Sequence, residues 1–304
     1  MTRRGNLRFT LVVHPRCLLE RWFCLAVWEL VEGPLPYLRL SFLEERATVR
    51  AVFTTRWGGV SEGPFDTLNL GLHVGDDVDR VRRNRRLLAA ATGVPLESWV
   101  LAEQVHGAQV AVVGRKESGR GAESLETVIR QADGLVTAEP GIALVALFAD
   151  CVPVYLVDPV RRAVALVHAG WKGTLGGISA RAVVAMVETL GCRPEDLWAV
   201  IGPSIGPCCY EVKEQVVDLF RREFSWAEYL LQKSAGKESW YLDLWEANRV
   251  ALLAAGLPPA QIAVAGLCTC CHPELFFSHR RDRGRTGRLA ALVSWRGITP
   301  GGAI

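Results

Sequence analysis

The chain of 304 residues has the length of one large domain or of two ordinary ones. Its hydrophobic share of 50% and charged share of 22% are those of an average globular protein, which excludes a disordered tail, a collagen-like repeat and a coiled coil. The net charge of +3, from 35 basic and 32 acidic residues, is too small to attract nucleic acid over the whole surface. With no recognisable secretion signal, the nine cysteines favour reduced thiols or metal ligands over disulfides.

The first 33 residues differ in pattern from the rest of the chain. The apolar run at 17–30 carries charges, is too short to span a bilayer and is followed by no small-residue cleavage site. One side of a short amphipathic helix would hold Leu19, Trp22, Phe23 and Ala26. The alternative is an appendage, or a start codon assigned too far upstream. We therefore expect an N-terminal appendage over 1–33, one α/β domain over 34–304, and no transmembrane segment.

The domain alternates short apolar runs with helical patterns. The pattern predicts strands at 48–55, 99–103, 109–113, 134–137, 142–148, 154–157, 163–167, 197–202, 262–267 and 289–295, and helices at 78–91, 177–190, 213–223 and 244–255. The central runs are almost continuously apolar, which is typical of strands buried on both faces. No internal repeat, low-complexity segment or linker interrupts them, so we expect a single domain.

Three side chains that can bind a metal lie where predicted strands give way to turns. They are His106, Cys151 and His168. Two imidazoles and a thiolate would leave a fourth zinc position open for water, as catalytic zinc sites do. Their wide separation in sequence makes this signal weak, because each could also be a hydrogen-bonded core histidine or an inert cysteine. A third interpretation is a thiol hydrolase in which Cys151 is the nucleophile, His168 its base and Asp150 or a nearby amide the orienting group.

Several polar clusters have the composition of substrate contacts. Arg56 precedes Trp57 and two glycines, Lys172 closely follows His168, and Arg280 follows two phenylalanines and a histidine. An aromatic face beside a cation suits a purine with a phosphate next to it, although each cluster could equally be ordinary surface or core.

Further cysteines occur at 208–209 and 268–271, next to His272. They could suggest a second metal site. Adjacent cysteines have poor geometry for one tetrahedral ion, so we expect buried or lining thiols there. The arginine-rich stretch at 82–86 belongs to a predicted helix that also contains apolar Leu and Ala residues. This favours a solvated helix face over a nucleic-acid patch.

Taken together, the motifs resemble those of the laccase-domain, or multicopper-polyphenol-oxidase, family, whose bacterial members are also called peptidoglycan editing factors and purine nucleoside phosphorylases. In family order they are the stretches 53–61, 68–71, 74–77, 104–107, 132–134, 149–153, 168–173, 201–205, 210–212, 276–280 and 286–288. The resemblance covers the chain from near Tyr37 to Trp295. It implies a single-domain layered α/β sandwich with a mixed central sheet.

The resemblance also implies a zinc ion bound by His106, Cys151 and His168, with copper as an alternative metal. It implies phosphorolysis of adenosine, inosine and methylthioadenosine, together with adenosine deamination. On this basis we assign Cys151, Asp150 and Asn69 to catalysis. The residues assigned to binding substrate and phosphate are Arg56, Lys172 and Arg280.

The expected partners are therefore purine nucleosides and phosphate, with no nucleic acid and no membrane, in the cytoplasm; the oligomeric state stays open. Three other functions remain as alternatives. They are a cysteine hydrolase or peptidoglycan-precursor editing factor using Cys151 and His168, a copper-dependent polyphenol oxidase, and a binding module that keeps a metal for stability. Copper oxidation fits less well, because one site of two histidines and one cysteine lacks the metal cluster that reduces oxygen to water.

Overall fold

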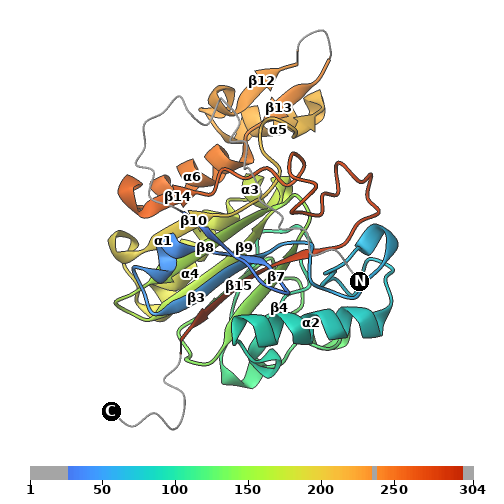
Figure 1. The fold of residues 1–304 in the computed structure, drawn as a ribbon. Helices are drawn as coiled ribbons and strands as arrows, with labels where there is room; N and C mark the ends of the chain where they lie inside the picture. Colours follow the sequence, from blue (N-terminus) through green and yellow to red (C-terminus); the bar gives the residue numbers. More distant parts are fainter. Residues whose placement is uncertain (1–26, 235–237, 297–304) are drawn as a thin grey trace.

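A computed structural model describes residues 27–234 and 238–296 (Figure 1). The amphipathic helix predicted around Leu19 to Ala26 lies outside these residues. Strand β1 (Glu29–Val31) pairs antiparallel with β2 (Tyr37–Arg39). Residues of the predicted N-terminal appendage thus form the edge strand of a sheet.

The first sheet has six strands in the order β1-β2-β3-β15-β7-β4. Its remaining members are β3 (Val49–Thr54), β4 (Trp99–Leu101), β7 (Ala143–Phe148) and β15 (Leu289–Trp295). Only β4 and β7 pair in parallel, so the sheet is mixed. The last strand of the described chain, β15, lies between β3 and β7.

The second sheet also has six strands, in the order β14-β10-β8-β9-β6-β5. They are β5 (Val110–Val112), β6 (Gly134–Thr137), β8 (Val152–Asp158), β9 (Ala163–Ala169), β10 (Trp198–Ile201) and β14 (Ile262–Val264). A long antiparallel hairpin of β8 and β9 forms its centre, and each end of the sheet has one parallel pair.

The two sheets pack face to face, and alternate residues of each central strand face different layers. In β7, Leu144 and Phe148 belong to the core between the sheets, whereas Val145 and Leu147 belong to the core on the opposite face. This alternation follows from the two-residue period of a strand. It explains why the central runs are apolar throughout: a second sheet covers one face and helices cover the other.

Helices cover the outer faces of both sheets (Figure 1). Helix α2 (Val78–Thr92) lies on the first sheet; the Asp77 carboxylate caps its start and Gly93, with φ of 69°, ends it. The second sheet is covered by α4 (Ile178–Leu190) and α6 (Leu244–Ala254). Two shorter helices are α1 (Ser41–Glu44) and α3 (Trp171–Leu175). None of the described helices is long and apolar enough to cross a membrane.

A small third sheet stands apart from the sandwich beside helix α5 (Glu214–Glu223), at the top of Figure 1. It consists of β11 (Glu211–Val212), β12 (Leu231–Lys233) and β13 (Trp240–Leu242). The predicted layered α/β sandwich is therefore confirmed, with two mixed sheets in place of one central sheet. The sequence could not distinguish these arrangements, because a strand covered by helices on both faces has the same apolar pattern.

Candidate active site and metal centre

A cavity of about 440 Å³ opens at the end of the sandwich where β4, β7 and β9 finish. This volume is in the range of small-molecule sites. The cavity is lined by His73, Glu103, Gln104, His106, Leu147, Ala149, Asp150, Cys151, His168, Gly170, Trp171, Ile205, Tyr210, Leu244, His279, Arg280 and Arg288. Five of the predicted site residues are among them, namely His106, Asp150, Cys151, His168 and Arg280.

The three predicted metal ligands converge in this cavity. Donor atoms of His106, Cys151 and His168 all lie within 4.8 Å of one another. The two imidazole rings meet edge to face, with centroids 4.8 Å apart. His168 is buried, Cys151 half-buried and His106 exposed, so the group opens toward solvent on the side of His106.

The register of the β8–β9 hairpin brings two of these ligands together. Pro153 pairs with His168 and Val152 with Ala169, so Cys151 comes to lie beside Gly170. A Cβ on Gly170 would stand 3.1 Å from the Cys151 Sγ and 3.2 Å from the His106 ring. Only glycine leaves the sulfur and the imidazole unobstructed at this position.

The carboxylate of Asp133 organises both histidines. It accepts hydrogen bonds from the backbone N–H groups of His106 and Gly107, at 2.9 and 2.7 Å. One of its oxygens also lies 2.9 Å from Nδ1 of His168. If Nδ1 donates its hydrogen to this carboxylate, Nε2 of His168 is the ring nitrogen left on the side of Cys151, where its lone pair can bind a metal. Ligand histidines in metal sites are commonly oriented in this way.

The same neighbours set the charge of the sulfur. Burial by itself would raise the pKa of Cys151, but His168 and His106 lower it to about 6. Burial would conversely lower the pKa of His168, whereas the Cys151 thiolate and Asp133 raise it to about 9. Cys151 is therefore a thiolate at neutral pH, which is the form that binds metals and attacks carbonyl carbons.

Three cavity residues have a left-handed backbone that side chains rarely adopt: Gln104 (φ 58°), His106 (φ 61°) and Asp150 (φ 90°). Specific hydrogen bonds hold all three, including the bond from the His106 N–H to Asp133. The Gln104 amide bonds both the N–H and the C=O of Leu147 at 2.8 Å. Such conformations persist where surrounding structure over-determines them, and they are concentrated at functional sites.

Asp150 is held from two sides. Its buried carboxylate accepts hydrogen bonds from the Thr269 hydroxyl at 2.7 Å and from the backbone N–H of Arg280 at 2.6 Å. These two bonds fix the carboxylate in the cavity wall next to Cys151.

The donor set of this group fits a transition-metal ion. Two imidazoles and one thiolate, all within reach of one centre, are the ligand types that zinc prefers. Three protein ligands and an exposed side correspond to the open coordination of catalytic sites rather than to the closed shell of structural ones.

Two arginines bring positive charge to the cavity. Arg280 lies over the Tyr210 ring at 5.2 Å and donates to the carbonyl of Glu211 at 2.8 Å. Arg288, which is half-buried, donates to the carbonyls of Thr286 and Gly287. Arg280 belongs to the predicted phosphate-binding set, whereas Arg288 does not.

The other three predicted site residues do not line the cavity. Arg56 donates to the carbonyls of Asp66 and Pro273 and stacks on the Phe277 ring at 4.7 Å. Lys172 is exposed, with its Nζ 5.6 Å from the ring centroid of Trp171. Their roles in phosphate binding stay predictions, without a contact that places either side chain in the cavity wall.

Asn69 is fully buried and binds the backbone of a residue that lines the cavity. Its Oδ1 accepts from the backbone N–H of Arg288 at 2.9 Å, and its amide donates to Asp76 at 2.9 Å. It therefore positions the backbone of an arginine that does line the cavity. Its predicted catalytic role has no contact of this kind to support it.

Sequence reasoning gave no role to Asp133, Gln104, Arg288 or Tyr210. Asp133 was visible only as part of the motif at 132–134, and its bonds to His106 and His168 depend on the fold. Arg288 was likewise visible only as the last residue of the motif at 286–288. A polar residue inside a motif that otherwise consists of small or apolar residues is the signal that could have identified both.

Comparisons with known proteins find relatives over most of the chain. A family model described as multi-copper polyphenol oxidoreductase laccase matches residues 50–296. Purine nucleoside phosphorylase YlmD of Geobacillus stearothermophilus is 48% identical over 246 residues, 81% of this chain and 90% of that protein. Adenosine deaminase RL5, from an unknown prokaryotic organism, is 36% identical over 251 residues, 82% of this chain and 95% of that protein. The crystal structure of YlmD from G. stearothermophilus has a TM-score of 0.83 and 44% identity, over 90% of this chain and 100% of that chain.

The chain belongs to the multi-copper polyphenol oxidoreductase laccase family. This confirms the family predicted from the motifs, and the structural likeness confirms the α/β fold class. The relatives above are named for two reactions of purine nucleosides, phosphorolysis and deamination, which supports an enzymatic role for the cavity.

Proposed function

We propose that the protein is a purine nucleoside phosphorylase, acting on adenosine, inosine and methylthioadenosine, with adenosine deaminase activity as a second reaction. The observation that carries this proposal is the convergence of His106, Cys151 and His168 in a cavity that also holds two arginines. The names of the relatives support the same reactions.

The cavity offers the groups that phosphorolysis needs. Arg280 and Arg288 carry the charge to hold a phosphate dianion, and Arg280 is fixed by its bond to the Glu211 carbonyl. The rings of Tyr210 and Trp171 provide apolar faces for a purine. In the reaction a phosphate oxygen forms a bond to the sugar C1′ while the C1′–N9 bond breaks, and the departing purine must gain a proton.

Asp150 is the group that we assign to proton handling or sugar orientation. Its carboxylate is fixed by Thr269 and by the backbone of Arg280, so it needs little reorganisation when substrate binds. In deamination, water adds at the purine C6 and ammonia leaves, which also requires proton transfer from water to the departing nitrogen.

We assign the metal as zinc, bound by His106, Cys151 and His168. Zinc bound there would supply a Lewis acid that lowers the pKa of water to about 7. Asp133 would keep His168 oriented, and Cys151 would bind as the thiolate. Copper has the higher affinity for such ligands, so metal analysis of protein purified without added metal checks the identity.

We also propose that the protein acts in the cytoplasm. The cysteines of the described residues are all free, which agrees with a reducing compartment. Cell fractionation with an antibody to the protein tests this, and recovery outside the cytoplasmic fraction would contradict it.

The test of the reaction is incubation of the purified protein with adenosine, with and without phosphate, followed by chromatography. Adenine formed only with phosphate, together with ribose 1-phosphate, is the expected result. Inosine formed in both samples is the expected sign of deamination. No turnover of adenosine, inosine or methylthioadenosine by zinc-loaded protein would contradict the proposal.

One observation favours a second candidate, a thiol hydrolase. Cys151, His168 and Asp133 are arranged as nucleophile, base and orienting carboxylate, with the thiol already ionised at neutral pH. The two functions differ in their need for metal. Dialysis against a chelator is expected to abolish nucleoside turnover, and added zinc to restore it. If the metal-free protein keeps its full activity, catalysis depends on Cys151 as the nucleophile and not on a metal, as expected of a thiol hydrolase.

A further inference from the structure

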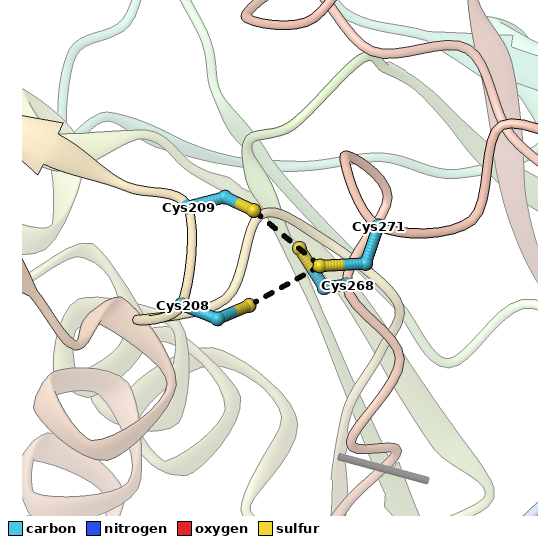
Figure 2. Close-up of side chains that lie close together, drawn as sticks. All are labelled: Cys208, Cys209, Cys268 and Cys271. Atoms are coloured by element: carbon cyan, nitrogen blue, oxygen red, sulfur yellow. Dashed lines mark hydrogen bonds between the residues drawn. The ribbon is translucent and has the colours of Figure 1, made fainter. Parts of the chain in front are cut away.

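Four cysteine side chains from two loops gather outside the cavity described above. This four-cysteine cluster consists of Cys208, Cys209, Cys268 and Cys271. Their sulfur atoms all lie within 4.8 Å of one another, and Figure 2 shows the side chains of both loops directed toward a common centre. The Sγ of Cys271 is 3.5 Å from that of Cys208 and 3.4 Å from that of Cys209.

Local backbone geometry explains how two adjacent cysteines can share one centre. The N–H groups of Cys209 and Tyr210 both donate to the carbonyl of Gly206 at 3.0 Å, which closes a tight turn. Within this turn both side chains of 208–209 point to the same side (Figure 2). The expectation of poor geometry, drawn from adjacency alone, therefore does not hold for this turn.

The opposite loop has a spacing that the sequence analysis overlooked. Two residues separate Cys268 from Cys271, which is the C-x-x-C spacing typical of zinc ligands. The N–H of Gly206 donates to the Sγ of Cys268 at 3.2 Å. Hydrogen bonds from backbone amides to ligand sulfurs orient the ligand and disperse its charge.

We propose that the four-cysteine cluster binds a second zinc ion, with a closed, structural coordination shell. A tetrahedral zinc site with Zn–S distances of about 2.3 Å places its sulfurs about 3.8 Å apart. Two sulfur separations in the cluster, 3.5 and 3.4 Å, are close to that value and all others are within 4.8 Å, so the ion requires only small side-chain shifts. The inference does not depend on which reaction the cavity catalyses.

The positions of the sulfurs favour a metal over a disulfide. A disulfide needs one pair of sulfurs about 2.05 Å apart, with the others left out. Here Cys271 is almost equally distant from two partners, and the remaining thiol, Cys268, approaches the same centre. Four thiolates around one point repel each other unless a cation lies between them.

Hydrogen bonds also fix the backbone between the two ligand positions of the loop at 268–271. Arg281 binds the carbonyls of Thr269 and Cys270, which lie between the two ligand positions of that loop, at 2.8 and 3.4 Å. The same guanidinium pairs with Asp282 at 2.9 Å, so its contribution to the cluster is to hold this loop in place.

Such an ion would connect two loops that build the cavity. The loop before β11 contributes Ile205 and Tyr210 to the cavity wall. The other loop contributes the Thr269 hydroxyl that fixes Asp150. A zinc ion between the two loops would fix their positions relative to each other without contacting substrate.

The experiment is native mass spectrometry and metal analysis of the full-length protein purified under reducing conditions without added metal. We expect about two zinc ions per chain in the wild type and about one in Cys271→Ser. Cys270→Ser is the matched control, because this cysteine lies in the same loop but outside the cluster. Equal zinc content in Cys271→Ser and Cys270→Ser would overturn the proposal, as would a wild-type mass lowered by a disulfide between cluster cysteines.

A second measurement covers the case in which Cys271→Ser fails to fold. Cobalt is substituted for zinc in Cys151→Ser, which removes the only thiolate of the cavity group. Intense thiolate-to-cobalt absorption must persist in that protein, because four thiolates remain in the cluster. Absence of this absorption would overturn the proposal. Failure of nucleoside turnover in the zinc-loaded wild type, with this absorption intact in Cys151→Ser, would instead count against the proposed function alone.

Discussion

The two groups of converging metal-binding side chains in the described residues are built in opposite ways. His168 lies at the end of β9, Cys151 directly precedes β8, and His106 lies in the loop after β4. All three line the cavity, and His106 is the exposed one. The four-cysteine cluster comes from two loops and uses thiols only. Three ligands leave room for a reacting molecule, whereas four complete the shell. The sheets thus position the open group, whereas the two loops beside it would be joined by the proposed second zinc ion.

The largest effect is expected from Cys151→Ser. Loss of a central ligand should lower nucleoside turnover by at least about a thousandfold, as removal of a catalytic group does. The thermal midpoint of the same protein should change less than that of a cluster variant. Steady-state kinetics and calorimetry on one preparation measure both. Substantial activity in Cys151→Ser would show that the open group is not the reacting centre.

The next effect is expected from Cys271→Ser, on stability rather than chemistry. A ligand present at about 100 times its dissociation constant stabilises the folded state by about 2.7 kcal/mol. At an unfolding entropy of about 2.1 cal/mol/K per residue, such a loss should lower the midpoint of a 304-residue chain by about 4 °C. Calorimetry against Cys270→Ser measures it. Equal thermal midpoints of the two variants would show that the four-cysteine cluster does not stabilise the fold.

A smaller effect is expected from Asp133→Asn, which leaves all three ligands of the open group in place. The amide cannot accept three hydrogen bonds as the carboxylate does, so His168 loses its orientation. Activity or metal affinity should fall about 10–100-fold, the usual cost of losing such a partner. Titration with a competing chelator measures the affinity. Zinc in the four-cysteine cluster should be unchanged, which provides the internal control.

The smallest effect is expected from Arg280→Ala. Removing one of two cavity cations should raise the KM for phosphate about tenfold, roughly 1.4 kcal/mol, with a smaller change in the KM for the nucleoside. Lys172→Ala is measured beside it, because Lys172 is also predicted to bind phosphate but does not line the cavity. If both variants raise the phosphate KM equally, phosphate binds over a wider surface than the cavity wall.

The regular part of the fold could be predicted well from the sequence. The strands predicted at 134–137 and 289–295 coincide with β6 and β15, and the helix at 78–91 differs from α2 by one residue. Each has a strong local signal: an unbroken apolar run, or an N-cap aspartate and a terminal glycine. Helix α3 and the third sheet were not predicted, since elements of two to five residues carry little periodicity.

The site was predictable only where a residue's own chemistry indicates its role. His106, Cys151 and His168 are the kinds of side chain that bind metals, and a motif surrounds each of them. Asp133 acts through contacts with residues 26 to 35 positions away, which no local pattern records. Arg56 has a suitable charge and aromatic neighbours, but its guanidinium reaches Pro273, 217 positions away, instead of the cavity.

The position of β15 also has a consequence for how the protein is made. This strand is inserted between β3 and β7, and Arg288 immediately precedes it. On the ribosome, the first sheet cannot close until residues near 295 have emerged, although β3 was synthesised some 240 residues earlier. Pairing across such a separation in sequence is slow and leaves strand edges exposed. The nascent chain can therefore complete the first sheet and the cavity wall that contains Arg288 only after β15 has been synthesised, and until then the edges of β3 and β7 stay unpaired.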